Sequence, residues 1–239
     1  MMKKSVQGLM ALVVLFLAVQ AVQARDLTQN MQADVFALAG ASTLVDAQTW
    51  TAADHIYHTR SELGLKYVVG VAVPFGKLFK IETAFTGGPN NLVLTDTSLN
   101  PRKNTTFPVT FYSGSITAVA HAPYAFKHWR PYGAVGVEYD RFSPSSSAVS
   151  LARNNGFASV STAEINHNDK TGIVIGGGLD RKLTKRLTFR IDLRDHVTGT
   201  PAFGMPPIPT LDSSANYPVK GRANNIVYTA GFMYHFGKL

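Results

Sequence analysis

The end of the chain shows a clear alternation of hydrophobic residues. In the segment NNIVYTAGFMYHF, every second residue from Ile226 to Phe236 is large and apolar or is alanine, and the residues between them are smaller and more mixed. A period of two residues is typical of a β-strand, in which successive side chains point to opposite faces. This segment is therefore predicted to be a strand with one strongly apolar face and one mixed face.

The same alternation recurs along the rest of the chain. Five further segments show it clearly, at residues 63–73, 78–85, 132–140, 172–180 and 187–194. Two more segments show it weakly, at residues 34–42 and 110–122. Together with the C-terminal segment, the pattern predicts eight strands.

The connections between these strands alternate in length. Short turns follow the second, fourth and sixth strands, with the sequences PFGK, APYAFKHWRP and DRKLTKR. The other connections are long, at about residues 43–62, 86–106, 143–171 and 197–223. This rhythm places short and long connections at opposite ends of an up-and-down antiparallel sheet. Outer-membrane barrels have this asymmetry, with short periplasmic turns and long extracellular loops.

The two faces of the strands indicate which solvent each one meets. In hydrocarbon every backbone polar group must be bonded within the protein, so a β structure that crosses a membrane has to close. Arg190, Asp192 and Arg194 lie on the mixed face, where they would point into such a barrel and pair with one another. The sequence thus predicts an all-β fold, an eight-stranded antiparallel transmembrane barrel with four long extracellular loops.

A soluble exported barrel or sandwich is the alternative fold, with the large apolar rows turned inward. It would leave outward faces rich in glycine, valine and alanine, whereas strands of soluble proteins usually present lysine, glutamate and threonine. It also gives no reason for the alternation of short and long connections. The membrane-spanning barrel is therefore favoured.

The first residues favour export from the cytoplasm. Lys3 and Lys4 precede an apolar run at about residues 9–19, and small residues follow at Val22 and Ala24. These are the three parts of a secretory signal peptide, predicted to cover residues 1–24 with cleavage after Ala24. The apolar run is short for an uncleaved helical anchor, which needs about 20 residues. Residues 25–239 are then the barrel domain, in the outer membrane of a Gram-negative cell envelope.

The amino-acid composition limits the kinds of binding partner that can be expected. The chain has no cysteine, so it has neither a disulfide framework nor an N-terminal cysteine for a lipid anchor. Its net charge of +8 suits anionic surfaces such as lipid head groups. Export and the lack of a basic–aromatic motif argue against nucleic acid. The end with the short turns is basic and is expected to contact phospholipid head groups. Contact with the cell wall is the alternative. The basic residues at this end are Lys77, Lys127, Arg130, Arg181, Lys182, Lys185 and Arg186.

Three segments carry a family resemblance: RPYGAVGVEYDRF, GIVIGGGLDRKLTKRLTFRIDLRDH and VYTAGFMYHF. With them the sequence, over about residues 34–236, resembles the eight-stranded outer-membrane barrels that include the transmembrane domain of outer-membrane protein A. The resemblance implies that Phe236, with Tyr234 and Phe232 before it, forms the C-terminal signal read by the barrel-assembly machinery. Here Gly237, Lys238 and Leu239 follow the aromatic residue, which departs from the family pattern. Lipopolysaccharide and phospholipid are the lipid partners expected of such a barrel.

Charged residues on the mixed face are the candidate functional residues. They are Lys66, Lys80, Glu82, Glu138, Asp180, Arg190, Asp192 and Arg194. Relatives carry a similar interior network, so a gated ion path is one interpretation. Packing is favoured, because an eight-stranded barrel is just wide enough for side chains to fill, whereas aqueous channels need about 16 strands. Inward glycines leave space for the long arginines.

No catalytic, cofactor or metal site is predicted. His55 and His58 lie three residues apart in a predicted loop, where a metal site would need further fixed ligands, so exposed histidines are favoured. Asp195 and His196 could belong to a nucleophile triad, but spacing ties no serine to them. Small outer-membrane barrels do include lipid A-modifying enzymes and proteases. The expected role is structural, in membrane integrity and surface presentation with possible adhesion through the loops; the alternatives are a narrow pore and a lipid-modifying enzyme.

Overall fold

The computed structural model describes residues 32–45, 48–52, 55–97, 103–154, 167–201 and 222–237. The predicted signal peptide with its cleavage site at Ala24 lies outside these residues, and so does most of the fourth long connection. Within the described residues, no helix has the length and apolar character that crossing a bilayer requires.

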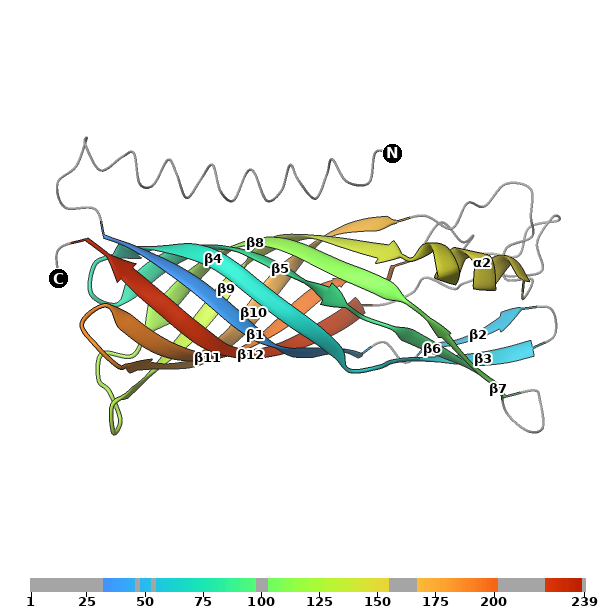
Figure 1. Ribbon diagram of the computed structural model, residues 1–239, viewed down its shortest axis with the longest axis horizontal. Coiled ribbons are helices and arrows are strands. Elements are labelled where there is room, and N and C mark those ends of the chain that lie inside the picture. Colours follow the sequence, from blue (N-terminus) through green and yellow to red (C-terminus); the bar gives the residue numbers. More distant parts are fainter. Residues whose placement is uncertain are drawn as a thin grey trace.

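Eight strands form a closed antiparallel barrel (Figure 1). Around the barrel their order is β1-β12-β11-β10-β9-β8-β5-β4, so each barrel strand lies beside the next one along the chain. β1 and β12 close the wall with an unbroken register from Ala33↔Phe236 to Val45↔Asn224. All eight predicted strands are confirmed, including the two weak ones. The strands are β1 (Ala33–Val45), β4 (Gly64–Phe75), β5 (Phe79–Pro89), β8 (Val109–His121), β9 (Trp129–Pro144), β10 (Asn168–Lys182), β11 (Leu187–Gly199) and β12 (Arg222–Phe236).

The large apolar rows face outward. Leu65 is 75% exposed and Val137 is 62% exposed, while their inward neighbours Lys66 and Glu138 are 3% and 5% exposed. A continuous apolar exterior of this kind is typical of a surface that meets lipid. The soluble alternative required the reverse arrangement and is therefore excluded. Closure of the sheet also leaves no barrel strand with an open backbone edge, as hydrocarbon demands.

Aromatic side chains mark two levels of the exterior. Toward the end that carries the long connections, the rings of Tyr67 and Phe85 and those of Phe85 and Tyr112 lie 6.1 Å apart. Toward the other end, Phe189 packs edge-on against Trp129 at 6.2 Å and Phe232 at 5.6 Å. Aromatic girdles at these two levels are expected where a barrel wall passes through the two membrane interfaces.

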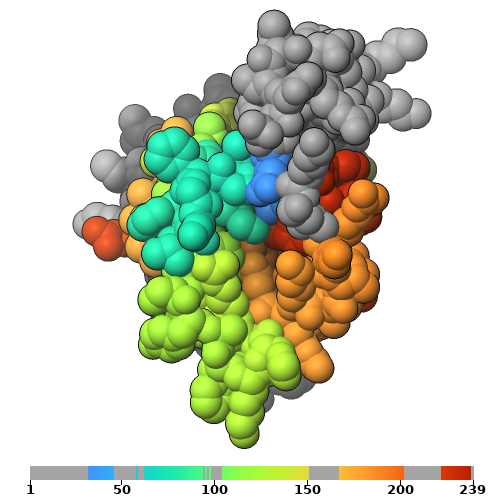
Figure 2. Space-filling view, turned by 90° about the vertical axis from the view of Figure 1, so that its left-hand side faces the viewer, coloured from blue at the N-terminus to red at the C-terminus, as the bar shows by residue number. Residues whose placement is uncertain are grey.

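The three short turns share one end of the barrel with the start of β1 and the end of β12 (Figure 1). Figure 2 views the molecule from this end, where residues of the three turns appear in teal, light green and orange. Arg130 connects two of the turns, since its guanidinium donates to the backbone oxygens of Ala122 at 2.9 Å and Lys77 at 3.0 Å. The other six basic residues predicted at this end have exposed side chains there.

Two of the predicted long loops contain further strands, which corrects the sequence prediction. β2 (Gln48–Ala52), β3 (His55–Ser61), β6 (Leu92–Asp96) and β7 (Lys103–Phe107) form a four-stranded sheet in the order β2-β3-β6-β7. This sheet projects beyond the barrel at the end opposite the short turns (Figure 1). It continues the β1–β4 and β5–β8 hairpins outward. Short threonine-rich segments such as QTWTA and KNTTF lack a clear apolar row, so alternation does not reveal them.

The third long connection begins with a helix rather than a loop, which is a second correction. α2 spans Ser146–Asn154. The hydroxyl of Ser145 accepts a hydrogen bond from the amide of Ala148 at 3.1 Å, which is the geometry of a helix N-cap. The chain therefore passes from β9 directly into a short helix at the end of the barrel that carries the long connections.

Candidate functional site

The barrel interior holds all eight charged residues that the alternation assigned to the mixed face. Arg190 and Glu82 have no accessible side-chain surface, and the side chain of Lys80, at the short-turn end, is 16% exposed. Charged groups at this depth are costly unless they are paired. The arrangement of their partners therefore decides what the interior can do.

Arg190 of β11 lies at the centre of the interior. Its Nε and Nη2 donate to the two oxygens of Asp180 on neighbouring β10, at 2.8 and 3.0 Å. Its Nη1 donates to Glu82 Oε1 at 2.6 Å. Glu82 belongs to β5, which lies opposite β11 in the strand order, so this ion pair crosses the lumen. The guanidinium also lies 4.5 Å from the ring centroid of Tyr132, within cation–π range.

Arg194, four residues further along β11 on the same face, repeats the arrangement. Its Nε donates to Asp192 Oδ1 at 2.9 Å, and its Nη2 donates to Glu82 Oε2 at 2.7 Å. Glu82 therefore accepts from both arginines. Tyr132 donates its hydroxyl to Asp192 Oδ2 at 2.5 Å. These residues, together with Asp180 and Arg190, are called the arginine network below.

Inward glycines make room for the arginine network. Gly176 lies opposite Arg194 in the β10–β11 register. A Cβ at Gly176 would lie 2.2 Å from the Leu193 oxygen and 2.9 Å from Arg194 Cγ, closer than packed atoms come. The glycine is therefore needed at this position, as the sequence pattern suggested for the inward glycines in general.

Toward the short-turn end, histidines join the interior network, which the sequence did not predict. His235 Nδ1 lies 2.6 Å from Asp34 Oδ1, and Lys80 donates to Asp34 Oδ2 at 2.7 Å. His121 Nε2 lies 2.9 Å from Asp180 Oδ2. Asp34, His121 and His235 all sit at inward positions of the alternation near strand ends, which is the signal that could have identified them.

Lys66 lies apart from the arginine network. Its ammonium donates to the backbone oxygens of Gly88 at 2.8 Å and Pro89 at 2.7 Å, at the end nearer the long connections. It also lies 5.3 Å from the ring centroid of Phe111. Within the described chain, no carboxylate lies close enough to the Lys66 ammonium to form an ion pair. Backbone oxygens therefore hold this side chain in place.

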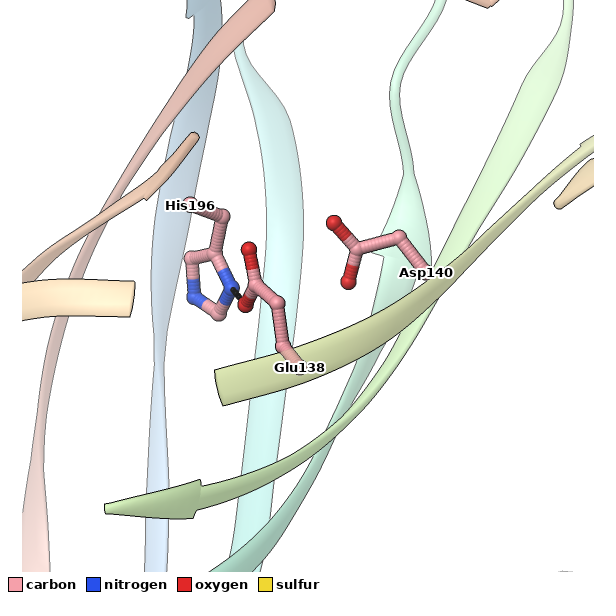
Figure 3. A group of neighbouring side chains, drawn as sticks. All are labelled: Glu138, Asp140 and His196. Carbon is pink, nitrogen blue, oxygen red and sulfur yellow. Dashed lines mark hydrogen bonds and ion pairs between the residues drawn. The ribbon is translucent and has the colours of Figure 1, made fainter. Parts of the chain in front are cut away.

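A second group of ionisable residues lies between the arginine network and the long-connection end. Glu138 and Asp140 of β9 and His196 of β11 offer ligand atoms that lie within 4.8 Å of one another (Figure 3). His196 Nδ1 lies 2.5 Å from Glu138 Oε2, and Ser113 donates its hydroxyl to the same oxygen at 3.3 Å. All three side chains are buried, and Asp140 is 0% exposed. This group is called the acid–histidine cluster below.

The hypothesised Asp195–His196 pair is not formed, which corrects that sequence interpretation. The two residues are neighbours on one strand, so their side chains point to opposite faces of the wall. His196 points inward to Glu138, whereas Asp195 accepts a hydrogen bond from the Asn224 side chain at 2.7 Å. A triad that uses both residues is therefore excluded by the register. The predicted histidine pair also lies elsewhere than supposed, in strand β3 rather than in a loop.

Little free space remains beside these groups. A cavity of about 10 Å³ lies next to Arg194, His196 and Thr229. A cavity of this size holds at most about one water molecule. The described interior is therefore packed with side chains at this level, as expected for a barrel of eight strands.

The sequence and the structure were each compared with those of known proteins. The sequence matches no protein-family model and no curated protein. In structure, it is similar to the outer-membrane protein OprG from Pseudomonas aeruginosa, with a TM-score of 0.54, 12% identity, and coverage of 88% of this chain and 98% of OprG. It is also similar to Neisserial surface protein A, with a TM-score of 0.51, 13% identity, and coverage of 85% and 97%. The chain has the fold of the eight-stranded outer-membrane barrels.

An outer-membrane barrel of this kind carries its apolar band in the membrane, as the exposed outer rows of this chain require. The residues predicted as the assembly signal lie at the short-turn end of β12. Phe232, Tyr234 and Phe236 all point outward, and the rings of Tyr234 and Phe236 lie 4.7 Å apart. Their recognition by the barrel-assembly machinery stays a prediction.

Proposed function

We propose that this outer-membrane barrel has a structural role, in membrane integrity and in presenting a surface above the membrane. Two features support the proposal. The lumen is crossed by buried ion pairs, and the β2-β3-β6-β7 sheet extends the wall beyond the apolar band. Loops and extensions on a rigid scaffold are where binding surfaces usually lie, so adhesion to an external partner would use this sheet.

The ion pairs across the lumen are the observation that carries the structural role. Arg190 reaches from β11 to Glu82 on the opposite wall, and neither side chain is accessible. For an ion to pass, these bonds would have to break and leave charges unpaired at low dielectric, which costs about 3–5 kcal/mol. A barrel closed in this way is expected not to conduct.

Conductance in a planar lipid bilayer tests this part of the proposal. Refolded protein, checked for a compact band before boiling on a gel, is expected to give no single-channel steps. Discrete steps that change in size in Glu82→Gln would favour the narrow pore instead. Asp169→Asn is a matched control on the outer surface. It should not change the measured conductance, whether or not the wild type conducts.

Surface presentation is tested by labelling introduced cysteines, since the chain has none of its own. Asn104 is exposed on β7, and Lys185 is exposed in the turn between β10 and β11. In whole cells, Asn104→Cys should react with a membrane-impermeant maleimide, whereas Lys185→Cys should react only after the outer membrane is opened. The reverse pattern would invert the barrel in the membrane and overturn the proposed surface.

A further inference from the structure

The acid–histidine cluster spans three neighbouring strands of the wall. Glu138 and Asp140 are alternate residues of β9, and His196 lies on β11, with β10 between them. In Figure 3 the carboxylates of both acids point toward the imidazole. Side chains from separate strands therefore converge on one point inside the barrel.

The absence of a side chain on the intervening strand allows this convergence. Gly172 of β10 lies opposite Glu138 on one side and Thr198 on the other. A Cβ at Gly172 would lie 3.1 Å from Glu138 Oε1 and 2.5 Å from Thr198 Cγ2. Glycine at this position lets Glu138 reach across β10 to His196.

The carboxylates of the cluster are not satisfied within the described structure. Glu138 Oε1 and both carboxylate oxygens of Asp140 are buried and have no hydrogen-bond partner. Buried polar groups are nearly always bonded, and an orphaned carboxylate costs more than a neutral group. Three such oxygens, close to the Ser113 hydroxyl, are therefore available as ligand atoms.

Within the described chain, no lysine or arginine forms an ion pair with these acids, and the imidazole of His196 is the ion-pair partner of Glu138. Arg194 is the nearest arginine along β11, but it is occupied by Asp192 and Glu82. Lys170 lies opposite Asp140 in the register, yet it forms no ion pair with it, and its side chain runs beside Gly199 instead. Lys66 donates to backbone oxygens. The cluster therefore holds two buried acids without a lysine or arginine partner, and a divalent cation that replaces their protons would neutralise them.

We propose that Glu138, Asp140 and His196 bind a divalent transition-metal cation in the barrel interior. One imidazole nitrogen with carboxylate oxygens is a donor set that suits Zn²⁺ and Mn²⁺, whereas Mg²⁺ and Ca²⁺ prefer oxygen alone. In a tetrahedral site, metal–ligand distances of about 2.0–2.2 Å place ligand atoms about 3.4 Å apart. From the observed limit of 4.8 Å, the most distant ligand atoms would have to close by about 1 Å, and the His196 and Glu138 atoms, now 2.5 Å apart, would have to separate.

Binding exchanges a proton for the metal. The hydrogen bond between His196 Nδ1 and Glu138 Oε2 contains one proton, which the cation displaces to solvent. His196 then stays neutral with its remaining proton on Nε2, and Nδ1 and the Glu138 carboxylate each present a lone pair to the cation. The bound ion then connects β9 to β11 across β10. This site goes beyond the proposed structural role, and neither conclusion depends on the other.

The test measures metal content in folded protein. Because the cluster is buried, the barrel is refolded in detergent from chelator-treated chains in the presence of Zn²⁺ or Mn²⁺, desalted, and analysed by elemental mass spectrometry. The wild type is expected to retain a single equivalent and to unfold at a higher temperature than protein refolded with chelator. In Asp140→Asn, affinity for the ion should fall by about 100-fold or more, since even outer-shell changes cost 10–100-fold.

Matched variants separate this site from adventitious binding. Asp140→Asn keeps every histidine of the chain, so loss of the equivalent in that variant cannot reflect surface histidines. Asp169→Asn makes the same change on the outer face and should retain the metal. A folded wild type that retains no ion above the level of Asp140→Asn would overturn the proposal. Retention of Ca²⁺ in preference to Zn²⁺ and Mn²⁺ would overturn the assignment to a transition metal.

Discussion

The arginine network and the acid–histidine cluster occupy the same lumen, but they satisfy their charges differently. In the arginine network, Arg190 and Arg194 reach Asp180, Asp192 and Glu82 at 2.6–2.9 Å. In the acid–histidine cluster, the carboxylate oxygens of Asp140 have neither a lysine or arginine partner nor a hydrogen bond of normal geometry within the described residues. The charges of the first region are satisfied by the protein alone, and those of the second would be satisfied by the cation proposed above. A buried charge therefore signals packing where its partners are present and a ligand where they are absent.

Breaking the arginine network should have the largest effect. Arg190→Ala leaves Glu82 and Asp180 buried without their main partner, so the free energy of unfolding should fall by about 3–5 kcal/mol. Gel mobility of unboiled samples in increasing urea measures the loss. Arg141→Ala is the matched control, since Arg141 pairs with Asp169 at the partly exposed outer surface, and it should cost less than about 1 kcal/mol. Equal losses in both variants would mean that the central network is not special.

Crowding the arginine network should have an intermediate effect. Gly176→Ala places a methyl group against the Leu193 oxygen and Arg194, so the free energy of unfolding should fall by about 1–3 kcal/mol. Gly133→Ala is the control, because a Cβ at that outward position has no atom within 4 Å. The same urea series compares the two. If Gly176→Ala were as stable as Gly133→Ala, the arginines would have more space than the structure gives them.

Neutralising the acid–histidine cluster should have the smallest effect and the opposite sign. In chelator-treated protein, Asp140→Asn replaces a buried acid that has no lysine or arginine partner with a neutral amide, so the free energy of unfolding should rise by about 1 kcal/mol. The contrast with Arg190→Ala is the sharpest form of the comparison, because both changes remove one ionisable side chain from the interior. A fall in stability under these conditions would mean that Asp140 already has a partner in the metal-free barrel.

Much of the barrel followed from the sequence, but its extension did not. The alternation placed Leu65 and Val137 outside and Arg190 and Glu82 inside, and the structure agrees at each position. The strands β2, β3, β6 and β7 were assigned to loops. A hydrophobic row exists only where one face of a strand meets an apolar medium, so strands beyond the membrane lack the signal that reveals the others.

The sequence also did not reveal which of the charged residues in the lumen contact one another. Glu138 and His196 are separated by 58 residues, and local sequence gives no reason to connect them. Asp195 and His196, adjacent in sequence, were the pair considered, and the strand pleat separates them. Asp140 was a visible inward acid, but only the register shows that it lacks a partner.

By itself, the sequence determined the number of barrel strands, the medium on each face and the set of charges that line the lumen. These are local properties, since side-chain parity along a strand decides them residue by residue. Only the tertiary structure decided that Arg190 meets Glu82 across the lumen and that Glu138 meets His196 across Gly172. The physical reason is that partners inside a barrel depend on the stagger of its strands at closure, which is a property of the whole wall rather than of any one strand.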